Sequence, residues 1–275
     1  MNNPLVSIIM PAYNASQYIS EAIGSVLRQS YNNWELLIVN DGSTDNTWVK
    51  IKQFDDQRIK VFSQENKGVS AARNVALSKM QGDYFCFLDA DDVMPPFSLE
   101  TRLAVFYRDD NIAFADGKVE VRSLDLNEIK RTYLPSFRGY PRKQLVKLSE
   151  KCFFGVSWMI RNDKNKIYHM KQDLTHGEDL LFYIEIADQG LYDYSTECVL
   201  INRQTSGSAM SNLEGLLYGY KQIYREVRKN KWAGKSALLF LKLKISKIMF
   251  LSFLKKGKVF KALKAGVGIG RLESY

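Results

Sequence analysis

The sequence predicts an α/β fold with a mixed, mostly parallel central sheet. Two short apolar runs, Val6 to Met10 and Trp34 to Val39, end in Pro11 and in Asn40-Asp41-Gly42, and both have the length of buried parallel strands. Between them, apolar residues recur at helical spacing, namely Ala22, Ile23, Val26 and Leu27. A strand, a helix and a second strand in this order predict two parallel strands joined by a right-handed crossover.

The alternation of helices and strands continues up to Pro95-Pro96. The pattern predicts a helix over Asp45 to Phe54, a strand over Ile59 to Phe62, a helix over Ser70 to Met80 and a strand over Tyr84 to Leu88. Beyond this point the alternation fades, and Ile112 to Val121 and Tyr192 to Ile201 are expected to be strands of a less regular half. Because open sheets of this kind bind ligands beyond the carboxyl ends of their strands, polar residues there are candidate site residues.

Composition indicates a folded, intracellular protein. Hydrophobic residues make up 45% of the 275 residues, which is enough apolar surface to offset the entropy lost on folding. The three cysteines, Cys86, Cys152 and Cys198, form no CxxC pair, and the two histidines, His169 and His176, add few ligands, so a zinc site or disulfide framework is not expected. Cys86 lies in an apolar run and is expected to be a buried thiol. With no signal sequence at the start, these features favour the cytoplasm.

The positive charge is concentrated near the C-terminus. The net charge is +9, and residues 221–275 hold 15 Lys and Arg but only Glu226 and Glu273, a local charge of +13 that leaves −4 for the rest of the chain. Lysines are interspersed with Leu, Ile, Phe and Met from Trp232 to Phe260, which rules against an ordinary transmembrane span. Two arrangements remain open: a helix lying in the surface of an anionic membrane, or a helical hairpin packed on the main domain. Nucleic-acid binding is disfavoured, because no binding motif accompanies the charge.

An acidic cluster follows the strand expected at Tyr84 to Leu88. Asp89-Ala90-Asp91-Asp92 places three carboxylates within four residues, where like charges repel one another unless a cation is bound. A hard divalent ion held by one or two carboxylates and by substrate phosphates fits this pattern. A solvated acidic turn, with Asp92 as the cap of the next segment, is the alternative.

Other strand ends carry groups suited to a nucleotide. Pro11-Ala12-Tyr13-Asn14 offers an aromatic ring for stacking on a base, and Asp41 offers a carboxylate that can accept a hydrogen bond from a base N–H. Asn66-Lys67-Gly68 leads into a helix carrying Arg73-Asn74, and Arg73 could pair with phosphate or base. The ordinary alternatives are a packed turn tyrosine, a turn followed by a helix N-cap within Asn40 to Asp45, and a solvated or capping Arg73.

Taken in order, these motifs and Gly177-Glu178-Asp179 resemble the family-2 inverting glycosyltransferases with the GT-A fold, a Rossmann-like fold for nucleotide-diphospho-sugar transferases. The resemblance covers residues 4 to 210 and implies a nucleotide-sugar donor, usually a UDP-sugar, with Mn²⁺ or Mg²⁺ as cofactor. It implies that Tyr13 and Asp41 hold the base, Arg73 fixes the nucleotide and Asp89 lies near the ribose. Pro11 and Ala90 complete the donor-binding set.

The resemblance also implies the catalytic residues. Asp91 would bind the metal that bridges the donor diphosphate, and Asp179, beside Glu178, would be the general base that deprotonates the acceptor hydroxyl. A base on one face of the anomeric carbon and a stabilised diphosphate on the other suit a single inverting displacement. Apolar residues at helical spacing come after this acidic pair, so a helix that opens at Glu178 and is merely charged in its first turn is the alternative.

Departures from the family pattern are expected to matter locally. Asn40 stands where an aspartate often precedes Asp41, and Thr205, after Arg203-Gln204, stands where a histidine is common. Trp158 falls on the acceptor side by its order in the chain, where it could stack on a sugar, although a buried core position is favoured. His169 and His176 are expected to be non-catalytic.

The sequence therefore predicts a nucleotide-sugar-binding half over residues 1–110, an acceptor-binding half over 111–215 and a basic helical extension over 216–275. The predicted activity is sugar transfer to a glycan or lipid-linked acceptor in cell-surface polysaccharide biosynthesis, peripheral to the inner face of the cell membrane. A nucleotidyltransferase or a non-catalytic nucleotide-sugar-binding protein is the alternative. The former usually has a glycine-rich phosphate loop, and Pro11 to Ser16 contains no glycine.

Overall fold

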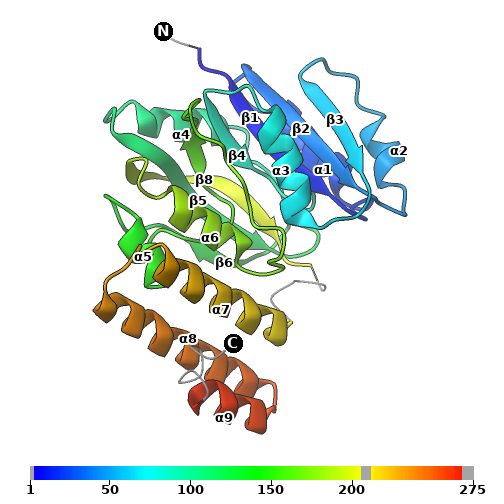
Figure 1. The fold of residues 1–275 in the computed structure, drawn as a ribbon. Coiled ribbons are helices and arrows are strands. Elements are labelled where there is room, and N and C mark those ends of the chain that lie inside the picture. Colours follow the sequence, from blue (N-terminus) through cyan, green and yellow to red (C-terminus); the bar gives the residue numbers. More distant parts are fainter. Residues whose placement is uncertain (1–2, 206–211, 268–275) are drawn as a thin grey trace.

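One mixed sheet forms the centre of the molecule (Figure 1). The computed structural model describes residues 3–205 and 212–267, and in these ranges the strands follow the order β3-β2-β1-β4-β7-β5-β6, with β8 paired to β5. Their bounds are β1 Val6–Ala12, β2 Trp34–Asp41, β3 Ile59–Gln64, β4 Tyr84–Phe87, β5 Ile112–Arg122, β6 Ile129–Tyr133, β7 Met159–Arg161 and β8 Leu191–Arg203.

The first half of the sheet is parallel, as the sequence predicted. Strand β1 pairs in parallel with β2 and β4, and β2 pairs in parallel with β3, so the ends that carry the polar motifs lie at one edge. The second half is mixed: β7 is antiparallel to β4 and β5, β6 is antiparallel to β5, and β8 is parallel to β5. The short strands β6 and β7 had not been predicted.

Helices cover both faces of the sheet (Figure 1). Their bounds are α1 Ile19–Leu27, α2 Thr47–Ile51, α3 Val69–Lys79, α4 Ser98–Phe106, α5 Arg142–Val146, α6 Glu178–Ile186, α7 Leu213–Lys229, α8 Lys235–Lys255 and α9 Val259–Val267. The helix predicted over Asp45 to Phe54 is reduced to the single short helix α2. Asp45 itself lies in the preceding turn, where its carboxylate accepts hydrogen bonds from Thr47 N at 2.9 Å and Ser16 N at 3.1 Å.

Two apolar layers fill the spaces between the sheet and its helices. Alternate side chains of a strand point to opposite faces, so Ile8 and Cys86 pack with α1 and α4, whereas Ile9 and Phe87 pack with α3 and α6. The residues of both layers are buried, and Cys86 is a buried free thiol, as predicted. Helices therefore pack on both faces of the sheet that carries the site.

The C-terminal helices stack below α6 (Figure 1). Helix α8 buries one face, formed by Leu241, Ile245, Met249 and Phe253, in the same apolar layer as α6 and α7. This part of the tail is the packed hairpin that the sequence left open. The second boundary predicted between regions, at 215 and 216, falls inside α7, and that division stays a prediction. Within the described ranges no helix combines the length and apolar character needed to span a bilayer.

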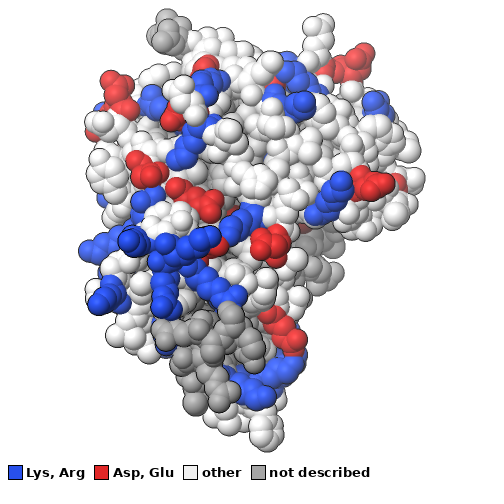
Figure 2. Space-filling view, viewed as in Figure 1, with Lys and Arg blue, Asp and Glu red and all other residues white. Residues whose placement is uncertain are grey.

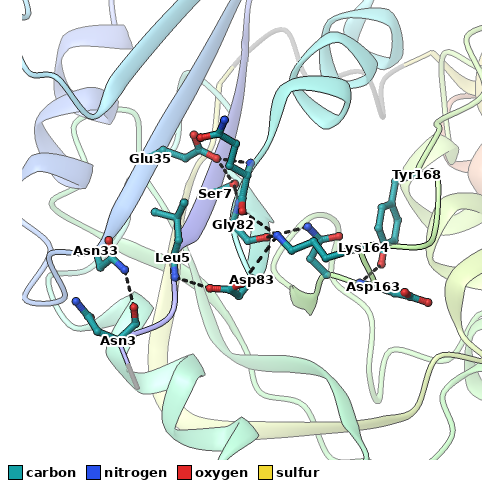
Figure 3. A network of polar contacts seen from close by, with 12 residues as sticks. Asn3, Leu5, Ser7, Asn33, Glu35, Gly82, Asp83, Asp163, Lys164 and Tyr168 are labelled. Carbon is teal, nitrogen blue, oxygen red and sulfur yellow. Dashed lines mark hydrogen bonds and ion pairs between the residues drawn. The ribbon is translucent and has the colours of Figure 1, made fainter. Parts of the chain in front are cut away.

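A polar network fastens the amino-terminal ends of the strands (Figure 3). Ser7 donates its hydroxyl proton to buried Glu35 at 2.5 Å and accepts a hydrogen bond from Gly82 N at 2.8 Å. Lys164 donates to the Gly82 carbonyl at 2.6 Å, and Asp83 accepts from Leu5 N at 2.9 Å. These bonds join β1, β2, β4 and the segment after β7 at the edge opposite the polar motifs.

Candidate active site

A cleft of about 580 Å³ opens at the carboxyl ends of β1, β2 and β4. Its lining residues are Pro11, Ala12, Tyr13, Asn14, Ala15, Tyr18, Asp41, Asn66, Gly68, Val69, Arg73, Asp89, Ala90, Asp91, Thr175, Glu178 and Thr205. All of the site residues predicted from the sequence line this cleft except Asp179. The fold thus brings together segments that are more than 160 residues apart in the chain.

The first two strand ends form one side of the cleft. Tyr13 is 51% exposed and presents a ring to solvent, as a stacking platform requires. Asn14 ties this loop to the next, because its side-chain oxygen accepts a hydrogen bond from Thr44 N at 2.9 Å and its backbone N–H donates to Ser43 Oγ at 3.1 Å. These two hydrogen bonds therefore hold the turn that carries Tyr13 in place.

Asp41 is buried and already has protein partners. Its carboxylate accepts hydrogen bonds from Lys67 N at 2.9 Å, Gly68 N at 2.8 Å and the Gln64 side chain at 2.7 Å. It therefore fixes the turn that leads into α3, a role that the sequence had not indicated. Each carboxylate oxygen has two acceptor sites, so Asp41 also retains acceptor capacity toward the cleft that it lines.

The three carboxylates after β4 take three different environments. Asp89 forms an ion pair with Arg73 at 2.7 Å. Asp92 is buried and accepts hydrogen bonds from Arg203 N at 2.9 Å and Asn202 Nδ2 at 3.1 Å, so it fastens the loop to β8 and does not cap α4. Asp91 faces the cleft, and the described residues provide no Lys or Arg ion-paired to it. Burial, followed by the charge of Asp89, raises the pKa of Asp91.

Arg203 holds the carboxylate loop in place. Its Nε donates to the Asp91 carbonyl at 2.8 Å and its Nη2 pairs with Glu21 at 2.5 Å, while Nη1 donates to the Leu124 carbonyl. Sequence reasoning missed this role. In the sequence, the segment that begins at Arg203 is distinctive only because Thr205 departs from the family pattern.

Arg73 joins the two sides of the cleft. It is 3% exposed, and its guanidinium pairs with Asp89 at 2.7 Å through Nη2 and with Glu178 at 3.2 Å through Nη1. Burial alone would lower its pKa, but the negative charges of Asp89 and Glu178 outweigh burial and raise the pKa. Arg73 therefore stays cationic and holds the opening of α6 against the loop after β4.

Asp179 lies in the first turn of α6, directly after Glu178 in the sequence. Burial is the largest cause of an increase in the pKa of Asp179 to about 7, and the charge of Glu178 adds to it while Arg73 opposes it. Gly155, in the loop before β7, lies beside this carboxylate, because a Cβ there would stand 3.9 Å from Asp179 Oδ2. A carboxylate with a pKa near neutrality is suited to accept a proton at physiological pH.

The donor set of the cleft fits a hard divalent cation bound together with phosphate. The described residues contain no group of three or more His, Cys, Asp and Glu placed to hold an ion by themselves. Mg²⁺ in nucleotide sites, however, is commonly held by one or two carboxylates and by substrate phosphates. Asp91 carries an oxygen ligand of this kind at the cleft, and burial, followed by the charge of Asp89, raises its pKa, an effect that a bound cation would offset.

The structure shows where three residues lie whose roles were uncertain from the sequence. Trp158 is fully buried, stacks on Tyr183 at a centroid distance of 4.3 Å and donates to the Cys152 carbonyl, so it belongs to the core, as favoured. Thr205 lines the cleft. His176 is buried in the segment before α6.

A second cavity of about 750 Å³ lies at the opposite edge of the sheet, near the network of Figure 3. Asp83, Tyr84, Arg161 and Lys164 are among its lining residues. Although this cavity is larger, it adjoins the amino-terminal ends of the strands, whereas ligands of open α/β sheets bind at the carboxyl ends. None of the predicted site residues lines it.

Comparisons with known proteins show the family of this chain. The family model of Glycosyl transferase family 2 matches residues 7–168. The UDP-Glc:alpha-D-GlcNAc-diphosphoundecaprenol beta-1,3-glucosyltransferase WfgD of Escherichia coli is 37% identical over 188 residues, covering 68% of this chain and 71% of that protein. TuaG of Bacillus subtilis (strain 168), named as a teichuronic acid biosynthesis glycosyltransferase, is 32% identical over 231 residues, covering 82% of this chain and 89% of that protein.

Solved structures show the same fold at low sequence identity. The crystal structure of S. aureus TarS 1-349 with UDP-GlcNAc has a TM-score of 0.68 at 16% identity, covering 98% of this chain and 93% of that one. The mannosyltransferase PcManGT from Pyrobaculum calidifontis, in complex with GDP-Man and Mn2+, has a TM-score of 0.66 at 17% identity, covering 100% of this chain and 82% of that one. The predicted GT-A fold is confirmed, and the chain belongs to the glycosyl transferase family 2.

Proposed function

We propose that this protein transfers a sugar, with inversion and with the help of a divalent cation, from a UDP-sugar to a hydroxyl group of a lipid-linked glycan. The observation that carries the proposal is the bridge made by Arg73. It holds the loop of Asp89 and Asp91 against the opening of α6, where Glu178 and Asp179 lie. A diphosphate-binding group and a base therefore meet across one cleft.

The donor is proposed to bind at the ends of β1, β2 and β4. The exposed ring of Tyr13 can stack on a base, and Asp41 can accept a hydrogen bond from a base N–H. UDP is favoured over GDP because WfgD, at 37% identity, is named for UDP-Glc, whereas PcManGT, bound to GDP-Man, is 17% identical. Asp91 would hold Mn²⁺ or Mg²⁺, which when bound would neutralise charge on the leaving diphosphate.

The acceptor is proposed to approach over Gly155 toward Asp179. With a pKa of about 7, the Asp179 carboxylate can take the proton of the attacking hydroxyl as the oxygen bonds to the anomeric carbon. Arg73 holds Glu178 at 3.2 Å, and the charge of Glu178 helps to raise the pKa of the proposed base Asp179. One displacement from the face opposite the diphosphate inverts the anomeric configuration.

Peripheral contact with a membrane is the second part of the proposal. WfgD is named for a diphosphoundecaprenol-linked acceptor, and such lipids reside in bilayers. Helices α8 and α9 expose large apolar side chains, among them Leu243 at 60% and Phe260 at 85%. On α8 these side chains lie opposite the buried face, because Phe240, Leu243, Leu251 and Leu254 recur at spacings of three and eight residues.

Basic side chains gather where α7 ends and α8 begins. Figure 2 shows Lys and Arg gathered over α5, the end of α7 and the beginning of α8. The basic residues of these segments are Arg142, Lys143, Lys147, Arg225, Arg228, Lys229, Lys231 and Lys235. Apolar residues that enter the headgroup region, together with lysines that contact anionic lipids, support a peripheral attachment.

The test is a donor panel assayed with and without metal. Thermal shifts with UDP, GDP, CDP and TDP should show a rise for UDP that is larger with Mn²⁺ than with EDTA. A panel of UDP-sugars with a polyprenyl-diphosphate-linked acceptor should then give product, and NMR of its anomeric proton should show inversion. Metal-independent transfer or retained configuration would refute the mechanism, and nucleotide binding without donor consumption would favour a non-catalytic binding protein.

A further inference from the structure

We infer that α7 belongs to the catalytic apparatus: its glycine face fixes the backbone before α6, and Gly219 is a positioning residue for Asp179. Figure 1 places α7 directly beside α6. The inference deepens the proposed function, because it rests on the role of Asp179 as the base.

The contact between α7 and the segment before α6 is unusually close. A Cβ placed on Gly219 would stand 2.1 Å from the His176 carbonyl oxygen and 3.0 Å from its carbonyl carbon. A Cβ placed on Gly215, one turn earlier, would stand 2.5 Å from Cε1 of the His176 ring. Any other residue at Gly219 must therefore displace backbone, whereas a residue at Gly215 must displace a side chain.

The segment that α7 touches is the one that lines the cleft. Thr175 and Glu178 line the cleft, and His176 and Gly177, which lie between them, contact α7. Gly177 has a φ of +74°, and a Cβ there would meet Ile223 of α7 at 2.9 Å. Helix α6 starts from this residue, since Leu181 N donates to the Gly177 carbonyl at 3.0 Å. A shift of this segment would therefore move the first turn of α6, including Asp179.

A second residue of α7 packs against the layer that contains α6. Tyr220 is the neighbour of Gly219 and packs against the apolar layer of α6. Burial raises the pKa of the Tyr220 hydroxyl, and the charge of the Asp179 carboxylate adds to that increase. The same turn of α7 thus contacts the backbone before Asp179 and packs against the layer that contains α6.

The experiment compares three Gly→Ala substitutions in the full chain. Gly219→Ala forces a backbone shift, Gly215→Ala displaces only side chains, the His176 ring and the Asn212 amide, and Gly234→Ala is the matched control, because nothing lies within 4 Å of its Cβ and its φ is −72°. Turnover is measured at saturating donor and acceptor, and the Kd of UDP with Mn²⁺ is measured by calorimetry. The carboxyl carbon signal of Asp179 is recorded by NMR in metal-free protein.

We expect Gly219→Ala to lower kcat roughly 10- to 100-fold, since a misplacement of about 1 Å at a catalytic group has effects of this size. Gly215→Ala should lower it less, and Gly234→Ala should leave it within about two-fold. The Kd of UDP should stay within about two-fold in all three proteins, and the Asp179 signal should move only in the first two.

A purely structural role would lower the melting temperature without changing kcat or the Asp179 signal, and that result would overturn the inference. An equal loss of UDP binding and turnover in Gly219→Ala would also overturn it. If Gly219→Ala does not fold, Gly215→Ala decides by the same criteria. Failure of the proposed function is distinguished by Asp179→Asn: if that variant keeps wild-type turnover, the base assignment fails whatever the glycine variants do.

Discussion

The two sides of the cleft are built by different means. The proposed donor side consists of the ends of β1, β2 and β4, which lie within the first 92 residues and take their spacing from the parallel sheet. The proposed acceptor side consists of Gly155, the segment from Thr175 to Asp179, and α7, which are brought together by side-chain and helix contacts. Substitutions should therefore separate donor binding from transfer according to the side that they affect.

The largest effect is expected on the donor side, from Asp91→Ala. It removes the carboxylate proposed to hold the cation, so transfer should fall by roughly 10³-fold or more, and the tightening of UDP binding by Mn²⁺ should disappear. Calorimetry with and without Mn²⁺ measures the second effect. Asp55→Ala, an exposed aspartate in the loop before β3, is the control and should behave as wild type. Turnover near normal in Asp91→Ala would remove the metal assignment.

Asp179→Asn tests the acceptor side. Transfer should fall roughly 10²- to 10⁴-fold, because the amide cannot accept the acceptor proton, while the Kd of UDP with Mn²⁺ should change little. Stopped assays and calorimetry give the two quantities. Asp173→Asn, at an exposed aspartate of the preceding loop, serves as the matched change. Loss of donor binding in Asp179→Asn would contradict the division between the two sides.

Arg73→Met should damage both sides at once, because Arg73 connects them. Removing a buried cation leaves Asp89 and Glu178 facing each other, and we expect the free energy of unfolding to fall by about 2–4 kcal/mol, less than for a fully buried pair because Asp89 is 36% exposed. Urea titrations measure this quantity. The exposed Arg28→Met should change stability by less than about 0.5 kcal/mol. Wild-type stability of Arg73→Met would show that the bridge is dispensable.

The pH dependence should report the state of Asp179. Its pKa is raised to about 7, so the base is protonated below that pH, and turnover should rise about tenfold per pH unit before levelling above neutrality. A bound cation nearby favours the ionised form, so the midpoint in the loaded enzyme should lie at or below 7. NMR titration of the metal-free protein should place the Asp179 midpoint near 7, against about 2 for Asp45. A normal midpoint near 4 for Asp179 would exclude the proposed environment.

The smallest effect on chemistry is expected from the surface of α8 and α9. The double variant Leu243→Ser and Phe260→Ser should reduce binding to vesicles containing phosphatidylglycerol roughly 10-fold or more, because two apolar side chains no longer enter the bilayer. Transfer to a water-soluble acceptor should be unchanged. Ile167→Ser, at a loop residue that is 94% exposed, is the control and should bind as wild type. Unchanged vesicle binding of the double variant would refute the attachment.

The donor side could be predicted from the sequence because local patterns determine it. Each polar motif comes directly after an apolar run, and parallel strands carry their ends to one edge, so Tyr13, Asp41 and Asp91 were expected near one another. The sequence did not reveal that the three carboxylates after β4 have different partners and environments. That division depends on Arg73 and on Arg203, which lie far from them along the chain.

The acceptor side was harder to predict because its contacts are tertiary. Nothing local in the sequence around Gly219 or His176 indicates that they meet, since the signal is a glycine in a helix facing a carbonyl of another segment. The tail was ambiguous for a related reason. Helix α8 carries apolar residues on two opposite faces, so one pattern predicted both a packed helix and a membrane surface.

The position of Arg203 also sets the order in which the enzyme can mature. The loop of Asp91 and Asp92 is made early in synthesis, but the bonds that fasten it come from Asn202 and Arg203, about 110 residues later. Contacts separated this far along the chain form late, because a long loop must close first. We therefore expect a nascent chain that has not yet emerged beyond β8 to have the β1–β4 sheet but no competent metal site, so that nucleotide sugar is engaged only by a nearly complete polypeptide.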